Sequence, residues 1–105
     1  MRKKITIPEL LLMKRDGRKV TVLTAYDYPT ARLLDAGGLD VILVGDSAGV
    51  VFGGHENTLP VTMDDMVYHT RSVARGCQTA LLMADMPFAS YATVDQAVRN
   101  AARLM

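Results

Sequence analysis

Short apolar runs alternate with amphipathic segments along the chain. The apolar runs cover residues 20–24, 41–44 and 80–84. The second and third runs are almost continuously apolar, and this pattern is typical of parallel strands that are covered on both faces. We therefore predict three β-strands, separated by longer segments with helical periodicity.

Threonines mark the starts of three predicted helices. Each is followed three residues later by an acidic or amide residue, in the pairs Thr6 and Glu9, Thr62 and Asp65, and Thr93 and Gln96. In such pairs the hydroxyl accepts a backbone N–H of the first helical turn, and the later side chain can reach back. The last helix has the clearest apolar stripe, formed by Val94, Ala97, Val98, Ala101, Ala102 and Met105.

A shorter helix is predicted over residues 29–36, between the first two strands. Pro29 falls in its first turn, and Gly37 and Gly38 end it. Gly76 ends the next helix in the same way. The resulting order is a helix followed by three strand–helix units. This order predicts an α/β fold with a parallel sheet and right-handed crossovers.

The chain of 105 residues forms one domain at most, residues 1–105. Three strands make a small sheet, and the final helix lacks a C-terminal cap. We therefore expect either a very small doubly wound unit or a single incomplete domain, the first part of a larger fold.

Composition narrows the functional classes. The net charge of +1 indicates neither a nucleic acid nor an anionic membrane as partner. The apolar runs are far shorter than the about 20 residues that a spanning helix needs. Charged residues 14–16 end the N-terminal apolar region, which argues against an export signal. The single cysteine, Cys77, cannot form an intrachain disulfide, and this favours the reducing cytoplasm. We expect Cys77 to be a small apolar residue beyond a helix end.

Candidate chemistry lies at the carboxyl ends of the strands, where parallel α/β folds place their sites. Asp27, Asp46 and Asp85 each follow a predicted strand within a few residues. If the second and third strands are neighbours, they lie about 4.8 Å apart, and the carboxylates of Asp46 and Asp85 would repel each other. A hard cation such as Mg²⁺ between them would remove this conflict. Alternatively, one aspartate caps the following turn and the other is solvated. The residues alone leave both interpretations open.

Residues 45–54 contain four glycines and Ser47, with no obvious helix. A backbone this open can approach a ligand closely or present N–H donors to it. A mobile loop is the alternative. A phosphate-binding P-loop is excluded because the Gly-Lys-Ser/Thr ending is absent.

Residues 45–49 also fit the Gly-x-Ser-x-Gly pattern of serine hydrolases, with Ser47 as nucleophile. That elbow needs a helix directly after the serine and a histidine late in the chain. Residues 50–54 are a poor helix start, and neither His55 nor His69 follows Asp85. We place His69 on a helix face. A serine hydrolase is therefore kept only as an alternative function.

Three tyrosines near the strand ends, Tyr26, Tyr28 and Tyr91, could line a pocket. Packing with a solvated hydroxyl is the more common arrangement for each.

Read together, these segments resemble the ketopantoate hydroxymethyltransferase family. The resemblance runs in order from about Ile5 to the last residue. Its motifs are residues 24–28 (TAYDY), 43–47 (LVGDS), 54–55 (GH), 58–62 (TLPVT), 68–70 (YHT) and 84–88 (ADMPF). It implies a (β/α)₈ TIM-type barrel, of which this chain would hold the N-terminal helix and the first three βα units.

The resemblance also implies an activity. A hydroxymethyl group passes from 5,10-methylenetetrahydrofolate to 3-methyl-2-oxobutanoate, giving ketopantoate for pantothenate and coenzyme A synthesis. It implies Mg²⁺ chelated by the 2-oxo acid, a cytoplasmic location and a large ring-like homo-oligomer. A related lyase or mutase acting on 2-oxo acids is an alternative.

Transferred position by position, the resemblance makes Asp46 and Asp85 metal-site carboxylates that also lie near the substrate. It makes Ser47 a substrate contact. The family's substrate-binding lysine, a further metal-site glutamate and the catalytic glutamate base lie on later strands, so no catalytic residue is assigned here. We expect the chain alone to be inactive, and to fold poorly or associate. The competing hypothesis is a non-catalytic fragment, or a module that works by assembling with its missing half.

Overall fold

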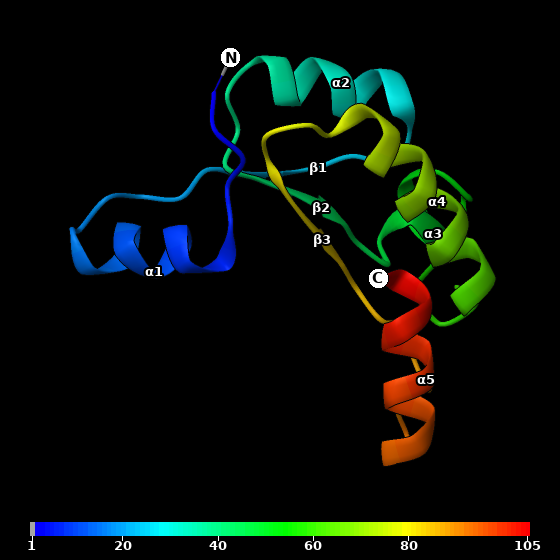
Figure 1. The fold of residues 1–105 in the computed structure, drawn as a ribbon. Helices are drawn as coiled ribbons and strands as arrows, with labels where there is room; N and C mark the ends of the chain where they lie inside the picture. Colours follow the sequence, from blue (N-terminus) through cyan, green and yellow to red (C-terminus); the bar gives the residue numbers. More distant parts are fainter. Residues whose placement is uncertain (1) are drawn as a thin grey trace.

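The computed structural model describes residues 2–105. A three-stranded parallel sheet in the order β1-β2-β3 forms its centre (Figure 1), which confirms the predicted α/β fold. In chain order the elements are α1 (Ile7–Arg15), β1 (Val22–Thr24), α2 (Tyr28–Ala36), β2 (Val41–Val44), α3 (Ala48–Val51), α4 (Met63–Gly76), β3 (Leu81–Ala84) and α5 (Val94–Leu104).

The sheet register decides which residues can form a site. Val41 pairs with Leu81, and Val44 pairs with Ala84, so β2 and β3 end level with each other. The residues that follow these strands therefore emerge side by side at one edge of the sheet. This edge is called the carboxyl edge below, and the edge where the strands begin is the amino edge.

Helices α2 and α4 pack against each other and against one face of the sheet. The core between them is apolar and includes Ala31, Ile42, Val44, Met66, Val73 and Ala80. The two helices approach each other closely at Gly76, the last residue of α4. A Cβ atom there would lie 2.8 Å from the Tyr28 carbonyl oxygen and 2.9 Å from the Arg32 nitrogen. Gly76 thus ends α4 as predicted, and it also permits this close approach.

The threonine caps are confirmed at α1, α4 and α5. The Thr62 hydroxyl accepts the Asp65 N–H at 3.1 Å, and the Asp65 carboxylate accepts the Thr62 N–H at 3.0 Å. Helix α2 begins one residue earlier than predicted, at Tyr28, because the Asp27 carboxylate accepts the Thr30 N–H at 2.8 Å and caps it.

Strands β1 and β3 are shorter at their starts than predicted. The N–H of Thr21 is taken by the Asp40 carboxylate at 3.0 Å, and that of Ala80 by the Asp35 carboxylate at 2.7 Å. Asp35 belongs to α2, and Asp40 directly precedes β2. Hydrogen bonds to side chains of other segments therefore replace the sheet pairing at the starts of β1 and β3. Local apolar character does not reveal such contacts.

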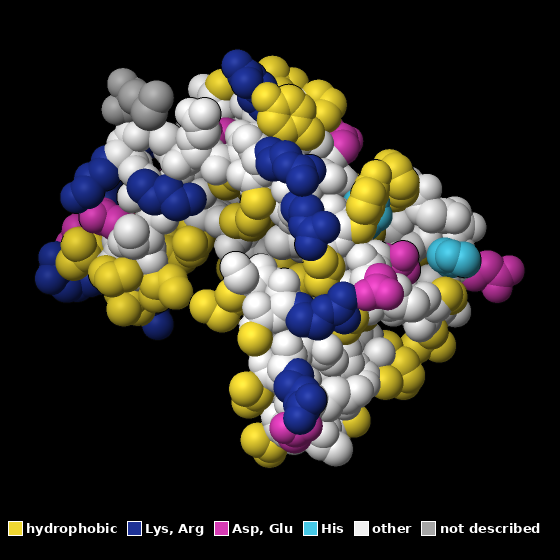
Figure 2. Space-filling model, turned by 45° about the vertical axis from the view of Figure 1, so that its right-hand side comes forward, with side chains coloured by type: hydrophobic (Ala, Val, Ile, Leu, Met, Phe, Trp, Pro, Cys, Tyr) yellow, Lys and Arg dark blue, Asp and Glu magenta, His cyan; other side chains and the backbone are white. Residues whose placement is uncertain are grey.

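The predicted coverage on both faces holds for β2 but is wrong for β3 in this chain. Met83 of β3 is 46% exposed, and Leu23 of the edge strand β1 is 51% exposed. Helix α5 projects away from the sheet and has no buried residue (Figure 1). Val94, Val98 and Met105 of its apolar stripe are exposed, Val94 at 83%, whereas Ala97 and Ala101 are half-buried. Hydrophobic side chains reach the surface in the lower part of Figure 2, where α5 lies.

Among residues 2–105, no helix combines the length and apolar character that crossing a bilayer requires.

Candidate functional site

The carboxyl edge brings Asp46 and Asp85 together, as the strand-end argument predicts. Asp85 directly follows β3, and only Gly45 separates Asp46 from β2. The Asp46 N–H donates to the Asp85 Oδ2 at 3.1 Å, and the Asp85 N–H donates to the Val44 carbonyl at 2.9 Å. Both aspartates are half-buried, and they line an open hollow of about 540 Å³.

The structure shows part of the alternative arrangement, in which one of the two aspartates caps a turn. One oxygen of Asp85 accepts a backbone N–H from the turn after β2. Within residues 2–105, the side-chain oxygens of Asp46 accept no hydrogen bond, and the second oxygen of Asp85 accepts none either. The cap uses one of the four carboxylate oxygens, so the pair keeps most of its capacity for a cation or ligand.

Gly45 leaves the space in which the Ser47 hydroxyl and the Asp85 carboxylate approach each other. A Cβ atom at this position would lie 3.1 Å from the Ser47 Oγ and 3.4 Å from the Asp85 Oδ2. The Ser47 hydroxyl is therefore on the same side of the turn as the Asp85 carboxylate. The structure brings together all three predicted site residues.

Tyr26 joins this group, although sequence reasoning favoured a packed ring with a solvated hydroxyl. Its Oη lies 2.6 Å from the Ser47 Oγ, and both residues are half-buried. The position of Tyr26 in the sequence could have predicted this contact, because Tyr26 follows β1 by two residues and so lies at the same edge. Tyr91 also lines the hollow beside Asp46 and Asp85. Tyr28 instead accepts a hydrogen bond from Arg32 at 2.9 Å.

The expectation that residues 45–54 contain no helix is wrong. One helical turn, α3, follows Ser47 directly, and the N–H groups of Val50 and Val51 each donate to the Ser47 carbonyl at 2.9 Å. Gly49 is buried against Val61, where any larger residue would clash with the Val61 side chain, so the packing requires glycine in this turn despite its weak helix propensity.

This turn meets one requirement of the hydrolase elbow, yet the rest is missing. Ser47 has ordinary helical angles, φ −56° and ψ −11°, whereas the elbow holds its serine in a strained conformation. Its hydroxyl pairs with Tyr26 and not with a histidine. The geometry gives the serine hydrolase alternative no support.

His69 lies within helix α4, as predicted, and it belongs to the buried face of that helix. It is 7% exposed, and its Nδ1 lies 2.9 Å from the Tyr26 carbonyl oxygen. Its ring makes edge contacts with Phe52 at a centroid distance of 4.9 Å and with Tyr68 at 5.5 Å. His69 therefore supports the carboxyl edge from within helix α4.

Comparison with known proteins identifies the family. A model of the ketopantoate hydroxymethyltransferase family matches residues 4–105. The chain belongs to this family. It is 68% identical over 106 residues to a 3-methyl-2-oxobutanoate hydroxymethyltransferase of Trichlorobacter lovleyi, and 61% identical over 106 residues to one of Pelobacter propionicus. All of the chain is aligned in both, covering 40% and 39% of the relatives. The chain thus spans about two fifths of the length of these curated relatives.

Family membership and topology agree. An N-terminal helix followed by three parallel strand–helix units corresponds to the N-terminal part of a TIM-type barrel, as the resemblance implies. Tyr26, Asp46, Ser47 and Asp85 all lie within the range that the family model matches.

The donor set of this family member fits Mg²⁺. Asp46 and Asp85 offer only carboxylate oxygens, and Mg²⁺ commonly takes one or two protein carboxylates while water and substrate oxygens complete its shell. Within residues 2–105, no group of three or more His, Cys, Asp or Glu side chains could hold a metal ion.

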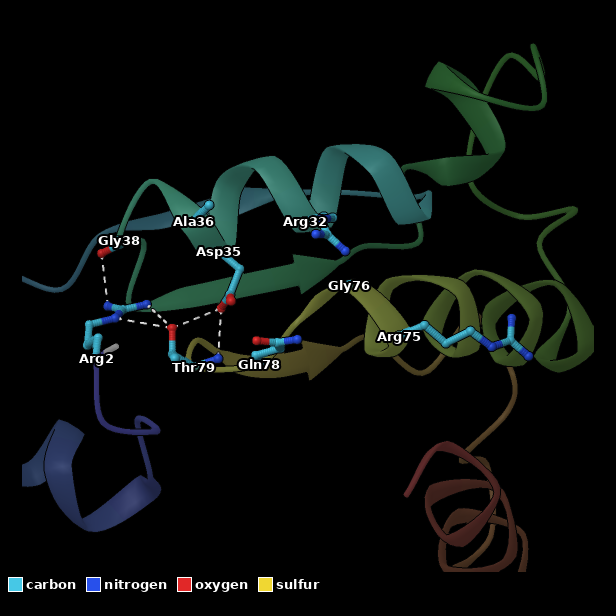
Figure 3. Close-up of a pocket in the computed structure, with 9 residues that line it drawn as sticks. All are labelled: Arg2, Arg32, Asp35, Ala36, Gly38, Arg75, Gly76, Gln78 and Thr79. Atoms are coloured by element: carbon cyan, nitrogen blue, oxygen red, sulfur yellow. Dashed lines mark hydrogen bonds between the residues drawn. The ribbon is translucent and has the colours of Figure 1, made fainter.

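A second hollow, of about 340 Å³, lies at the amino edge (Figure 3). Arg2 donates to the carbonyls of Gly38 at 2.9 Å and Leu39 at 2.6 Å and to the Thr79 hydroxyl at 2.8 Å. Asp35 accepts the Thr79 N–H at 2.9 Å and the Thr79 hydroxyl at 3.1 Å. These groups bind one another, so the network ties the N-terminal segment and α2 to β3.

Two side chains near the amino edge, Asp35 and Cys77, have pKa values shifted in opposite directions. Partial burial by itself raises the pKa of Asp35, but hydrogen bonds from Ala80, Thr79 and Gln78 outweigh it and leave that pKa below its ordinary value. Burial raises the pKa of the Cys77 thiol, which donates to the Ala80 carbonyl at 3.1 Å. Cys77 lies just beyond α4, as predicted, and is a packed, protonated thiol.

Proposed function

We propose that this chain supplies the metal- and substrate-binding edge of a hydroxymethyltransferase in the pantothenate pathway. The substrates would be 3-methyl-2-oxobutanoate and 5,10-methylenetetrahydrofolate, and the product ketopantoate. The single observation that carries the proposal is the convergence of Asp46, Ser47 and Asp85 at the carboxyl edge. Membership of the family supports the reaction class.

Asp46 and Asp85 would hold the Mg²⁺ ion. When bound, Mg²⁺ supplies Lewis-acid chemistry, polarising the 2-oxo group and stabilising the negative charge that develops on its oxygen. The two half-buried aspartates would balance the charge of the Mg²⁺ ion and hold it at the carboxyl edge. Gly45 keeps the approach open, since a side chain there would press on Ser47 and Asp85.

Ser47 would bind the carboxylate of the 2-oxo acid through its hydroxyl. A hydroxyl donating to a carboxylate forms a charge-assisted hydrogen bond, which is stronger than a neutral one. We assign no residue of this chain as the base that removes the C3 proton. We propose that the base and the remaining substrate contacts come from the part of the protein that corresponds to the other three fifths of its relatives.

The experiment uses a chimaera in which residues 1–105 replace the matching segment of the T. lovleyi relative. Exchange of the C3 hydrogen of 3-methyl-2-oxobutanoate with deuterium is followed by NMR, with Mg²⁺ and with a chelator. We expect Mg²⁺-dependent exchange that Asp46→Asn and Asp85→Asn each reduce about 100-fold, since each loses a charged contact.

Asp27→Asn is the matched control, because Asp27 lies at the same edge but caps α2. Asparagine is an equally good cap, so exchange by this variant should stay within about twofold. Chelator-resistant exchange, or equal loss in all three variants, would contradict the proposed site.

The alternative of a module that is inactive by itself rests on the exposed apolar surface of β1 and α5. The 105-residue chain is expected to show no C3 exchange with Mg²⁺, and robust exchange would overturn this expectation.

We further propose a homo-oligomeric, cytoplasmic protein on the basis of family membership.

A further inference from the structure

We propose that Tyr26 and His69 are positioning residues for Ser47, forming a three-residue relay from helix α4 to the carboxyl edge. Tyr26 orients the Ser47 hydroxyl, and His69 fixes the backbone of Tyr26. This inference rests on the proposed function, because the oriented hydroxyl is the one assigned to the 2-oxo acid's carboxylate.

The first link is the contact between two hydroxyls. The Tyr26 Oη and the Ser47 Oγ are 2.6 Å apart, a short distance for an O–H···O bond. A phenol is a stronger hydrogen-bond donor than an aliphatic hydroxyl such as that of serine. We therefore infer that Tyr26 donates and Ser47 accepts. The serine proton is then directed away from Tyr26 and is available to an anionic ligand.

The second link fixes the backbone that carries the phenol. The Nδ1 of His69 lies 2.9 Å from the Tyr26 carbonyl oxygen. A carbonyl can only accept, so Nδ1 carries the proton. Tyr26 is also held on both sides along the chain, because the Ala25 N–H donates to the Leu43 carbonyl at 3.0 Å and Asp27 caps α2.

The third link is the packing that fixes the imidazole. His69 is 7% exposed, and its ring meets the edges or faces of Tyr26, Phe52 and Tyr68 at centroid distances of 6.2, 4.9 and 5.5 Å. Phe52 directly follows α3, the turn that begins after Ser47. The same histidine therefore contacts the segments on both sides of the site serine.

Without the relay, the Ser47 hydroxyl would bind the carboxylate of a 2-oxo acid only weakly. A free hydroxyl rotates among three rotamers, and only one can direct its proton at a given ligand atom. A polarised chain from Tyr26 through Ser47 to a carboxylate strengthens each bond in it. The expected consequence is tighter binding of the 2-oxo acid, with a smaller effect on the chemical step.

The test is a double-mutant cycle in the chimaera, with Tyr26→Phe, Ser47→Ala and the double variant. Tyr26→Phe removes only the hydroxyl, and we expect it to raise KM for 3-methyl-2-oxobutanoate about 10-fold while kcat changes less than about threefold. In the Ser47→Ala background the same change should have an effect below about twofold, because the two hydroxyls act through one contact.

His69→Asn and His69→Gln test the second link. Asparagine places its amide nitrogen near the former Nδ1 and should retain much of the affinity, whereas glutamine places it near the former Nε2 and should not. Independent, multiplicative effects of Tyr26→Phe and Ser47→Ala would overturn the relay. So would an unchanged KM in Tyr26→Phe.

A second readout separates failure of this inference from failure of the proposed function. If the unmodified chimaera shows no Mg²⁺-dependent exchange, the proposed function fails. Crystal structures of the chimaera and its Tyr26→Phe variant then decide the relay. It predicts one Ser47 rotamer, within hydrogen-bond distance of Tyr26, and a changed or mixed rotamer in the variant. An identical single rotamer in both structures would contradict it.

Discussion

The two edges of the same sheet carry polar clusters of opposite character. At the amino edge, Arg2, Asp35 and Thr79 direct their donors and acceptors at one another and at backbone groups. At the carboxyl edge, Asp46 and Asp85 stand side by side, and most of their oxygens receive no hydrogen bond from residues 2–105. The comparison teaches that a polar cluster indicates a ligand site when its bonding capacity is unused. A satisfied cluster of similar size indicates stability.

The largest expected effect tests the carboxyl edge. Asp85→Asn and Asp46→Asn in the chimaera should each lower affinity for 3-methyl-2-oxobutanoate in Mg²⁺ about 100-fold. Asp85→Asn should change the free energy of unfolding by less than about 1 kcal/mol, because asparagine keeps a carbonyl oxygen that can still accept the Asp46 N–H. Isothermal titration and urea unfolding measure the two quantities. A large loss of stability with unchanged affinity would contradict the claim that the carboxyl edge binds the ligand.

The next effect tests the amino edge. Asp35→Ala leaves the Thr79 and Ala80 N–H groups without their acceptor, and should lower the free energy of unfolding by about 2 kcal/mol. Ligand affinity of the folded variant should be unchanged. Asp95→Ala is the control, since Asp95 forms an exposed pair with Arg99 and should cost less than about 0.5 kcal/mol. Equal losses in the two variants would contradict a stabilising network.

The pH dependence of the free energy of unfolding also tests whether Asp35 of the amino edge stabilises the fold. Hydrogen bonds lower the pKa of Asp35 below its ordinary value of 3.8, so the folded state binds this proton less readily than the unfolded state. The stabilisation is therefore present above the ordinary pKa and is lost as pH falls through the lower folded value. Urea unfolding of the chimaera across this acidic window should show a steeper pH dependence than unfolding of Asp35→Asn. Parallel curves would contradict the assignment.

The smallest effect concerns the space at the carboxyl edge. Gly45→Ala places a methyl group 3.1 Å from the Ser47 Oγ and should weaken 2-oxo acid binding about threefold to tenfold. Gly37→Ala is a matched control, because a Cβ there would be no closer than 3.4 Å to any neighbour. Its affinity should equal that of the unmodified chimaera, and a similar loss in both variants would argue against a local effect.

Features encoded by local pattern were predictable from the sequence. Apolar runs located β2 and its neighbours, threonine caps located the helix starts, and strand-end position selected Asp46 and Asp85. These features depend on residues close together in the chain or on a general property of parallel sheets.

Features that depend on tertiary contacts were not predictable. Gly49 of α3 is buried against Val61 at a position that no side chain could occupy, and β3 starts late because Asp35 takes the Ala80 N–H. The Tyr26–Ser47 contact joins residues 21 positions apart, and His69 reaches Tyr26 across 43 positions. No periodicity reports such pairs. Only the shared edge of the sheet could have suggested that Tyr26 lies near Ser47.

The most direct test of the central account is titration of 3-methyl-2-oxobutanoate into the chimaera, once with Mg²⁺ and once with a chelator. The account predicts saturable binding with Mg²⁺ that disappears with the chelator, in Asp46→Asn and in Asp85→Asn, but persists in Asp27→Asn. Binding of equal strength with the chelator, or in both aspartate variants, would contradict a site built on Asp46 and Asp85.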